Sequence, residues 1–478
     1  MTQTLAHYIG GEFTGASDAL KSVNPSNIDE IVAAFPEGGE ADVNAAVAAA
    51  KAAQPGWANA SPEVRADLLD KVANLIFARA NELGELLARE EGKTRAEGVG
   101  ETMRAARIFR YFGGEALRRH GFTLESTRPG LDVATYREAV GVVGLITPWN
   151  FPIAIPAWKS APALAFGNTV VWKPANVTPA MAAALTRIIH EAGVPPGVFN
   201  LVLGRGSVGQ AIVDHPDVAA VSFTGSQQVG AQVGASAMKR QARVQMEMGG
   251  KNPLVVLADA DLDKAVAIAA DGGFIQTGQR CTASSRVIVE DAIHDAFVAA
   301  LAERALSLKV GPALVEDTQV GPASSEGQFE QNLRYVGIAR DEGGRLAAGG
   351  DKVQSETPGY FMQPTVIADT NPDMRINNEE VFGPVVSTVR VKNYEEALAI
   401  ANRGNFGLSA GIVSNSAKYI RDFRKNVRAG MVMVNLPTAG VDYHVPFGGT
   451  RGSSYGPREQ GFAAVEFYTQ IKTVYTGD

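Results

Sequence analysis

Cysteine is nearly absent from this sequence. Cys281 is the only one among 478 residues. An internal disulfide is therefore impossible, and the default expectation is a cytoplasmic protein. The N-terminal residues also lack a basic segment followed by an apolar core, so no signal peptide is expected.

Other absences exclude further classes of protein. No uninterrupted apolar run approaches the roughly 18 residues needed to cross a membrane, so no membrane partner is expected. The 44 Lys and Arg against 51 Asp and Glu give a net charge of −7. The charges form no long run of one sign, which argues against a nucleic-acid partner. The six histidines show no ligand spacing, and one cysteine cannot form a thiolate cluster, so no metal site is expected.

The remaining composition, 45% hydrophobic and 20% charged, is typical of a globular enzyme, and the length suggests about two or three domains. The motif Ser61-Pro62-Glu63 predicts a helix start, with an N-cap and a proline in the first turn. Apolar residues then recur at helical spacing and predict one buried face. They are Leu68, Leu69, Val72, Leu75 and Ile76.

From about residue 141 the pattern becomes α/β. Short apolar runs alternate with amphipathic stretches, which predicts βαβ crossovers and a largely parallel sheet covered on both faces. The predicted strands are 141–147, 169–173, 198–203, 219–223 and 243–247, and the predicted helices are 178–192 and 207–215. A second unit of the same kind begins near Lys251. Its predicted strands are 253–257, 285–290, 385–391 and 431–435, and its predicted helices are 260–270 and 292–308.

Residues 121–140 and 459–478 fit neither unit. They contain strand-like runs at 133–137 and 471–475. Isolated strands of this kind often pair with each other or extend the sheet of another subunit.

Two glycine-containing loops are candidates for phosphate binding. The sequence Gly204-Arg205-Gly206-Ser207-Val208-Gly209 matches G-x-G-x-x-G between a strand and a helix. The acid expected at the tip of the next strand is missing, so a purely structural turn is the alternative. The junction Phe223-Thr224-Gly225-Ser226 is the better candidate, because glycine permits close backbone approach and serine can cap the following helix.

Cys281 lies in a polar loop beside Gln279, Arg280 and Thr282. It is either a small buried hydrophobe or a nucleophile, and a nearby guanidinium and a following helix N-terminus would both favour its thiolate form. Glu247 ends a strand and is either a solvated terminus or a general base, whose pKa its apolar flanks would raise. Asn150 follows a strand and either caps a loop or donates to a developing oxyanion.

These motifs together resemble those of the aldehyde dehydrogenase superfamily, in the right order and spacing across nearly the whole chain. The motifs are 147–152, 172–174, 223–226, 247–252, 278–281, 380–384 and 446–449. The stretches NLPTAGVDYHVPFGG (435–449) and SSYGPREQG (453–461) further resemble α-ketoglutaric semialdehyde (2,5-dioxovalerate) dehydrogenases.

The resemblance implies three parts in the chain. An NAD(P)-binding α/β domain would span residues 1–120 and 141–247, and a catalytic α/β domain would span 248–458. A small β oligomerisation domain would be built from 121–140 and 459–478, giving a homodimer or homotetramer. The implied activity is oxidation of an aldehyde to a carboxylic acid with NAD or NADP.

The resemblance also implies roles for individual residues. Cys281 would be the nucleophile, Glu247 the general base and Asn150 the oxyanion donor. Cofactor contacts would come from Thr147, Pro148, Trp149, Lys173, Asn176, Gly206, Gly225, Ser226, Val229, Gly249, Glu380 and Phe382. Substrate contacts would come from Phe151, Trp158, Phe447 and Arg280.

One departure concerns the cofactor. Many NAD-preferring relatives carry Glu three residues after the lysine, where this chain has Asn176. A neutral amide does not repel a 2′-phosphate, so we expect a relaxed choice between NAD and NADP, with room for a preference for NADP.

A carboxylated semialdehyde needs a cation in its pocket, because burial of an unpaired carboxylate is expensive. Arg280 and Lys159 are the two candidates, with helix capping or solvent exposure as the alternative for each. The alternative substrates are succinic semialdehyde and general aliphatic aldehydes. A CoA-acylating enzyme is disfavoured because such relatives generally lack the glutamate found at 247, and a silent scaffold is disfavoured because all three catalytic residues are present.

Overall fold

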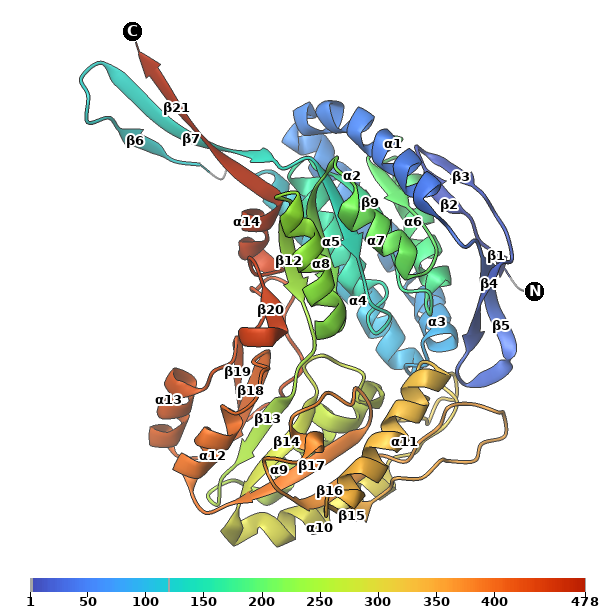
Figure 1. Cartoon of the computed structure of the whole chain (residues 1–478), viewed down its shortest axis with the longest axis vertical. Helices are drawn as coiled ribbons and strands as arrows, with labels where there is room; N and C mark the ends of the chain where they lie inside the picture. The colour runs from blue at the N-terminus through green and yellow to red at the C-terminus, as the bar shows by residue number, and fades with distance from the viewer. Residues whose placement is uncertain (1–2, 119–120, 478) are drawn as a thin grey trace.

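The computed structural model describes residues 3–118 and 121–477, which form two large sheets and two small ones (Figure 1). Helices pack on both faces of each large sheet, which confirms the predicted α/β class. No helix within the described residues is long and apolar enough to span a membrane.

The first large sheet has the strand order β20-β12-β11-β8-β9-β10-β2-β3. Its five central strands are parallel, as predicted, whereas the edge strands β20, β2 and β3 are antiparallel. These edges were not predicted because each strand has only two or three residues, too few to show a period. The bounds are β2 (His7–Ile9), β3 (Glu12–Thr14), β8 (Val142–Ile146), β9 (Thr169–Lys173), β10 (Phe199–Leu201), β11 (Val218–Thr224), β12 (Arg243–Glu247) and β20 (Ser454–Tyr455).

The order of this sheet reverses between two neighbouring strands. From β8 the chain continues to β9 and β10 on one side, and it then returns to add β11 and β12 on the other. In open α/β sheets, ligands bind beyond the carboxyl ends of the strands at such a switch point. The crevice beyond Ile146 and Phe223, which are paired in register, is therefore the expected cofactor position.

Helices cover the two faces of this sheet in separate groups. Alternation along β8 and β9 directs Val142 and Val171 toward α1, α7 and α8, and directs Leu145 and Trp172 toward the other group. The bounds are α1 (Glu40–Asn59), α2 (Pro62–Ala78), α3 (Ala80–Glu90), α4 (Arg95–Ala116), α5 (Ala154–Ala165), α6 (Pro179–Ala192), α7 (Gly206–Asp214) and α8 (Gln227–Lys239).

Helix α2 begins as predicted. The Ser61 hydroxyl accepts a hydrogen bond from the Val64 N–H at 3.3 Å, and Pro62 is its first residue. On the predicted apolar face three side chains are buried and the other two are half-buried. Buried are Leu69, Val72 and Ile76, and half-buried are Leu68 and Leu75.

The second large sheet has the order β15-β16-β17-β14-β13-β18-β19, parallel except for β15 at one edge. Its predicted strands and helices are confirmed to within about four residues at each end. The bounds are β13 (Asn252–Val256), α9 (Leu262–Phe274), β14 (Ser284–Glu290), α10 (Asp291–Ser307), α11 (Glu326–Asp341), β15 (Arg345–Ala348), β16 (Thr365–Thr370), β17 (Val385–Val391), α12 (Tyr394–Ala401), β18 (Ser409–Val413), α13 (Ala417–Asn426) and β19 (Met431–Val434).

The two strand segments outside these units pair with each other. Strands β6 (Thr123–Glu125), β7 (Leu131–Ala139) and β21 (Thr469–Gly477) form an antiparallel sheet that projects from the body (Figure 1). This confirms one of the two pairings expected from the sequence. Residues 459–468 do not join this arm: they include η4 (Gly461–Ala464) and the short helix α14 (Val465–Tyr468), which packs against α5.

A further small sheet near the N-terminus has the order β1-β5-β4. Its strands are β1 (Gln3–Thr4), β4 (Leu20–Asn24) and β5 (Asn27–Phe35). No strand was predicted in this part of the expected cofactor-binding domain. The division into cofactor-binding and catalytic domains remains a prediction, although β20, from the predicted catalytic segment, lies in the first sheet.

Candidate active site

Cys281 lies between the short 3-10 helix η1 (Ile275–Gly278) and β14, on the wall of a cavity of about 330 Å³. The predicted substrate contacts Phe151, Trp158, Phe447 and Arg280 line the same cavity. The rings of Trp158 and Phe447 lie 5.6 Å apart, centroid to centroid. The fold therefore brings the cysteine and all four residues to one chamber, which aromatic and charged side chains line together.

The backbone leading to Cys281 is strained. Gln276 and Thr277 both have a φ of 55°, a left-handed conformation that non-glycine residues rarely adopt. Two hydrogen bonds hold it: the Gln276 N–H donates to Glu97 at 2.8 Å, and the Thr277 hydroxyl donates to the Gly321 carbonyl at 3.0 Å. Such strain is common at functional sites and persists only where the surroundings enforce it.

Asn150 lies against this loop. Its Nδ2 donates to the carbonyl of Gln279, two residues before Cys281, at 3.0 Å, and its side chain is buried. An amide NH2 has two N–H bonds, so this contact leaves one for a second acceptor. The geometry is compatible with the predicted oxyanion role.

A buried ion pair fixes the loop that carries Asn150. Lys93 Nζ donates to Glu101 at 2.6 Å and to the Asn150 carbonyl at 2.8 Å. The other oxygen of Glu101 accepts from the N–H groups of Ile153 and Ala154, both at 3.0 Å, where α5 begins. A carboxylate at a helix N-terminus satisfies donors that have no partner within the helix.

Glu247 ends β12 and is only 3% exposed. Its burial raises the pKa of the carboxyl well above the usual value, and the nearby carboxylate of Glu459 raises it further. The Ser454 hydroxyl donates a hydrogen bond to Glu247 at 2.5 Å, and this bond opposes the rise in pKa. The predicted direction is confirmed, but its cause is burial within the whole fold rather than the flanking methionines alone.

The environment of Cys281 differs from the expected one. Burial raises the pKa of its thiol to about 12, and the carboxylates of Glu380 and Glu247 contribute in the same direction. No helix follows the cysteine, because the chain turns directly into β14. The expected helix N-terminus is therefore wrong. The guanidiniums of Arg280 and Arg104 do interact favourably with the thiolate, but burial and the carboxylates outweigh them.

The two cations predicted for a substrate carboxylate are both engaged elsewhere. Lys159 is fully buried, forms an ion pair with Glu459 and donates to the Ser222 hydroxyl at 2.7 Å. Its charge is matched inside the fold and it does not line the cavity, so this hypothesis is wrong. Arg280 does line the cavity, but its Nη2 donates to the carbonyls of Asp271 and Gly272 in the last turn of α9, as in the helix-capping alternative.

The predicted cofactor residues gather at the carboxyl ends of the first sheet. Thr147, Pro148 and Trp149 follow β8, Lys173 ends β9, Gly225 and Ser226 follow β11, and Gly249 follows β12. Asn176, Gly206, Ser226 and Val229 are exposed beside this crevice. The Ser226 hydroxyl accepts from the Val229 N–H at 3.4 Å and caps α8, as predicted.

Lys173 fits an anionic or polar ligand. It is 7% exposed, burial lowers its pKa to about 8, and no acidic group among the described residues forms an ion pair with it. A buried amine without a counter-charge is stabilised by a ligand that supplies oxygen acceptors.

Residues 204–209 are compatible with both alternatives from the sequence, a structural turn and a phosphate-binding loop. Gly204, at a φ of 144°, packs against Gly38, as in a structural turn, while Gly206 opens α7 with free space around it, as phosphate binding requires.

Glu380 and Phe382 lie on the other side of the crevice, from the second unit. The Gly250 N–H donates to Glu380 at 2.8 Å, and burial raises the pKa of Glu380 to about 7. A Cβ on Gly249 would fall 2.2 Å from this carboxylate, so only glycine permits the approach. Phe382 has a φ of 63° and meets Trp149 edge to face at 5.4 Å.

Sequence reasoning missed the contribution of α4. Glu97, Glu101 and Arg104 lie on one face of this helix, at spacings of four and three residues, and all three line the Cys281 cavity. The start of the helix could have been recognised from Thr94 and Glu97, which form a capping box. The contacts of the three side chains are long-range and leave no local signal.

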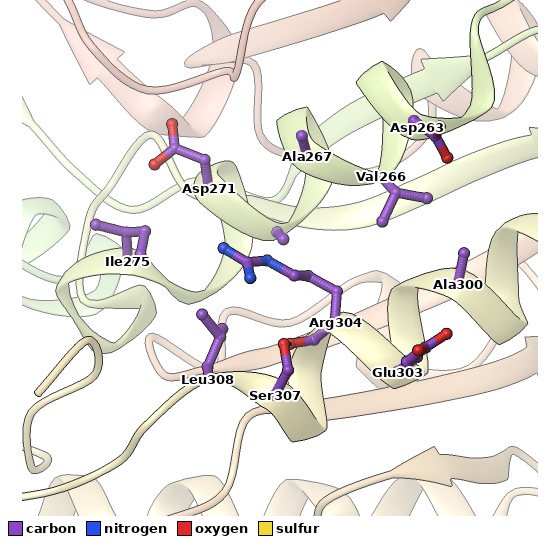
Figure 2. A pocket seen from close by; sticks show the side chains of 11 residues that line it. Asp263, Val266, Ala267, Asp271, Ile275, Ala300, Glu303, Arg304, Ser307 and Leu308 are labelled. Carbon is purple, nitrogen blue, oxygen red and sulfur yellow. The ribbon is translucent and has the colours of Figure 1, made fainter. Parts of the chain in front are cut away.

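A second cavity, of about 580 Å³, lies on the surface between α9 and α10. Figure 2 shows the side chain of Arg304 extending from α10 toward α9 across it. Small and aliphatic residues dominate its walls, and it contains no cysteine and none of the predicted site residues. The chamber at Cys281 is therefore the candidate active site.

Known proteins resemble this chain over nearly its whole length. A model of the aldehyde dehydrogenase family matches residues 13–474. The alpha-ketoglutarate semialdehyde dehydrogenase of Haloferax volcanii is 46% identical over 481 residues, covering 99% of each chain. The alpha-ketoglutaric semialdehyde dehydrogenase of Bacillus subtilis is 43% identical over 477 residues, covering 99% of this chain and 98% of its own.

Among solved structures, betaine aldehyde dehydrogenase from Staphylococcus aureus in complex with NAD+ superposes with a TM-score of 0.96 at 33% identity. The alignment covers 99% of this chain and 95% of that one. The family match, the identities and the shared fold extend over nearly the whole sequence. The chain therefore belongs to the aldehyde dehydrogenase family.

Proposed function

We propose that the chain oxidises a carboxylated semialdehyde, such as α-ketoglutaric semialdehyde, to the acid, through a thioester on Cys281. The observation that carries the chemistry is the arrangement around this cysteine. Asn150 donates to the carbonyl of Gln279, two residues before the cysteine, and the charges of Glu247 and Glu380 raise the pKa of its thiol. The chamber with Phe151, Trp158 and Phe447 on its walls opens beside it. The two curated relatives described above support the substrate class.

Each residue has a defined step. The Cys281 thiolate attacks the aldehyde carbon, and the Asn150 amide with a backbone N–H stabilises the oxyanion. Bound NAD or NADP supplies the acceptor for the hydride that leaves this adduct. Glu247 then takes a proton from water, the water attacks the thioester, and the acid is released with regeneration of the thiol.

The cofactor would be held at the switch point of the first sheet. Gly225 and the N-terminus of α8 suit a pyrophosphate, Lys173 and Asn176 suit the adenosine ribose, and Glu380 suits the second ribose. Because Asn176 carries no charge, both NAD and NADP are accepted. A preference for NAD above roughly a thousandfold in kcat/KM, about 4 kcal/mol, would contradict this.

The decisive experiment is a panel of aldehydes assayed with both cofactors. It contains α-ketoglutaric semialdehyde, succinic semialdehyde and neutral aliphatic aldehydes of four and five carbons. The highest kcat/KM is expected for a carboxylated semialdehyde, with acid as the product and no activity in Cys281→Ala. Highest kcat/KM for a neutral aldehyde would overturn the substrate assignment, and failure to oxidise any aldehyde would overturn the function.

The same proposal includes a homodimer or homotetramer formed through the projecting arm. Large apolar side chains are exposed along it, which is unusual unless another surface covers them. They are Phe122, Leu124, Ile471 and Tyr475, between 52% and 73% exposed.

The proposal also includes a cellular location. A single free cysteine at the active site suits a reducing compartment, so we place the enzyme in the cytoplasm, a placement that cell fractionation would test.

A further inference from the structure

Arg104 lies where two cavities meet. It lines the Cys281 chamber and also a neighbouring cavity of about 300 Å³, and the two cavities share Gly100, Arg104 and Val441. Arg107, one helical turn further along α4, lines only the second cavity and is exposed. A molecule moving from the second cavity toward Cys281 would pass the Arg104 side chain.

The guanidinium of Arg104 has few partners. Its Nη2 donates to the side-chain oxygen of Gln460 at a long 3.3 Å, and it lies 5.8 Å from the ring centroid of Trp158. Its Nε is buried without an acceptor, as is Nε2 of Gln460. Within the described parts of the chain no carboxylate forms an ion pair with Arg104. Burial of this charge lowers its pKa, against the influence of Glu101 and Asp442.

This corner of the chamber therefore has a positive charge and an excess of hydrogen-bond donors. Buried donors normally find acceptors, so an anion with several oxygens would complete the site. A carboxylate matches the planar guanidinium, which can bind both of its oxygens. Of the other two cations considered, Lys159 pairs with Glu459. Arg280 also has a buried Nε without an acceptor, but its Nη2 donates to two carbonyls at the end of α9, so its guanidinium is held there.

We propose that Arg104 binds the carboxylate at the far end of the aldehyde substrate, with Gln460 and Trp158 holding the guanidinium in place. This inference rests on the proposed function and names the residue that selects its substrate class. On the same helix face, Glu97 holds the loop before Cys281 and Glu101 holds the loop of Asn150. The distance from Arg104 to the loops of Cys281 and Asn150 is therefore fixed by one helix. In this proposal that distance also selects the length of the substrate.

The test compares each carboxylated semialdehyde with a neutral aldehyde of the same chain length, such as succinic semialdehyde with butanal. Arg104→Met keeps the bulk of the side chain and removes its charge. We expect kcat/KM for the carboxylated substrates to fall about 30-fold or more, mainly through KM, because the lost bonds involve charged groups. Activity on butanal should change less than about threefold, and Arg104→Lys should restore part of the loss.

The matched control is Arg110→Met on the same helix. Arg110 is exposed, forms a 3.0 Å ion pair with Asp70 and lines neither cavity, so both substrates should be unaffected. Binding provides a second measurement that does not depend on turnover. Glutarate should inhibit butanal oxidation competitively and raise Tm in the wild type, and it should do neither in Arg104→Met.

Two outcomes would overturn the inference while aldehyde oxidation still stands. One is an equal loss for butanal and succinic semialdehyde in Arg104→Met, which would give Arg104 a structural role only. The other is a wild-type enzyme that oxidises butanal but neither prefers carboxylated substrates nor binds glutarate. A wild type inactive on every aldehyde would instead refute the proposed function.

Discussion

At the scale of single residues, the thiol of Cys281 lies between acids and cations, and burial and the acids dominate its pKa: Arg280 and Arg104 line the same cavity and interact with it. Glu380 and Glu247 add to burial in raising its pKa to about 12. A nucleophile with so high a pKa is almost entirely protonated at neutral pH. The proposed mechanism therefore requires a base that removes the thiol proton before attack on the aldehyde.

This environment predicts a steep pH dependence of thiol reactivity. Below a raised pKa the thiolate fraction grows about tenfold per pH unit, so alkylation by iodoacetamide should accelerate continuously from pH 7 to pH 9. Glu380→Gln removes one of the charges and should give faster alkylation above about pH 7, where the Glu380 carboxyl is ionised. Because Cys281 is the only cysteine, mass spectrometry follows the reaction without interference.

The control for this measurement is Glu379→Gln. Glu379 is half-buried and accepts hydrogen bonds from Arg375 and Tyr335. The carboxylates that raise the pKa of the Cys281 thiol are other ones, Glu380 and Glu247 first among them. The alkylation rate of Glu379→Gln should equal that of the wild type. A rate that levels off below pH 8 would contradict the raised pKa.

Asn176 gives a second prediction at this scale. Asn176→Glu introduces a carboxylate beside the ribose position, which can accept bonds from ribose hydroxyls and repels a 2′-phosphate. The ratio of kcat/KM for NAD to that for NADP should rise at least tenfold. Asn176→Gln, which adds bulk without charge, should leave the ratio within about threefold, and a similar rise in that variant would show that size rather than charge is responsible.

At the scale of elements, α4 connects the parts of the site. Its buried Glu101 joins Lys93 to the start of α5, while Glu97 holds the strained loop before Cys281. Neither carboxylate is expected to touch a substrate. Their role is to hold the two loops that carry Asn150 and Cys281.

Glu101→Gln should be strongly destabilising, because it leaves the buried charge of Lys93 with a weaker partner. Loss of one member of a buried ion pair costs about 3–5 kcal/mol, which urea unfolding measures. Lys93→Met combined with Glu101→Leu should recover little of this stability, because it leaves the buried Glu91 without its cation and the N–H groups of Ile153 and Ala154 without an acceptor. The kcat should also stay low, since the loop of Asn150 loses its anchor. Glu85→Gln, on the exposed face of α3, should change neither quantity.

The same scale shows what the sequence could predict. Strands such as 169–173 and 243–247 were located to the residue, because buried parallel strands are short apolar runs bounded by turns. The roles suggested for Lys159 and for the helix after Cys281 were wrong, because they relied on neighbours in sequence. Glu459, about 300 positions from Lys159, neutralises that lysine, and no local pattern predicts such a contact.

At the scale of the whole molecule, the projecting arm is the feature that a single chain leaves incomplete. Ile471 and Tyr475 lie on one face of β21 and are 60% and 59% exposed. The pairing of β21 with β7 followed from the sequence, whereas this apolar face stays exposed in the single chain, and in our proposal a second copy covers it. Neither the hydrophobic periodicity nor the motifs of the sequence could therefore predict the number of subunits.

The arm predicts an oligomer that surface charge can dissociate. Ile471→Glu combined with Tyr475→Glu should reduce the molecular mass measured by light scattering to that of one chain, 50.4 kDa, or to a smaller assembly. Lys472→Gln, on the opposite face of the strand, should retain the wild-type mass. A wild-type mass in the double variant would exclude this face of the arm as the interface.

The position of Glu97, Glu101 and Arg104 on a single helix has a consequence for how the enzyme can diversify. An inserted or deleted residue between Glu97 and Arg104 would rotate the side chains that follow it by about 100° and take them out of phase with those before it. Exchange of residue 104 alone leaves the two glutamates in phase. A point substitution at residue 104 can therefore change the aldehyde preference, whereas a change in the length of this segment would also disturb the loops of Cys281 and Asn150.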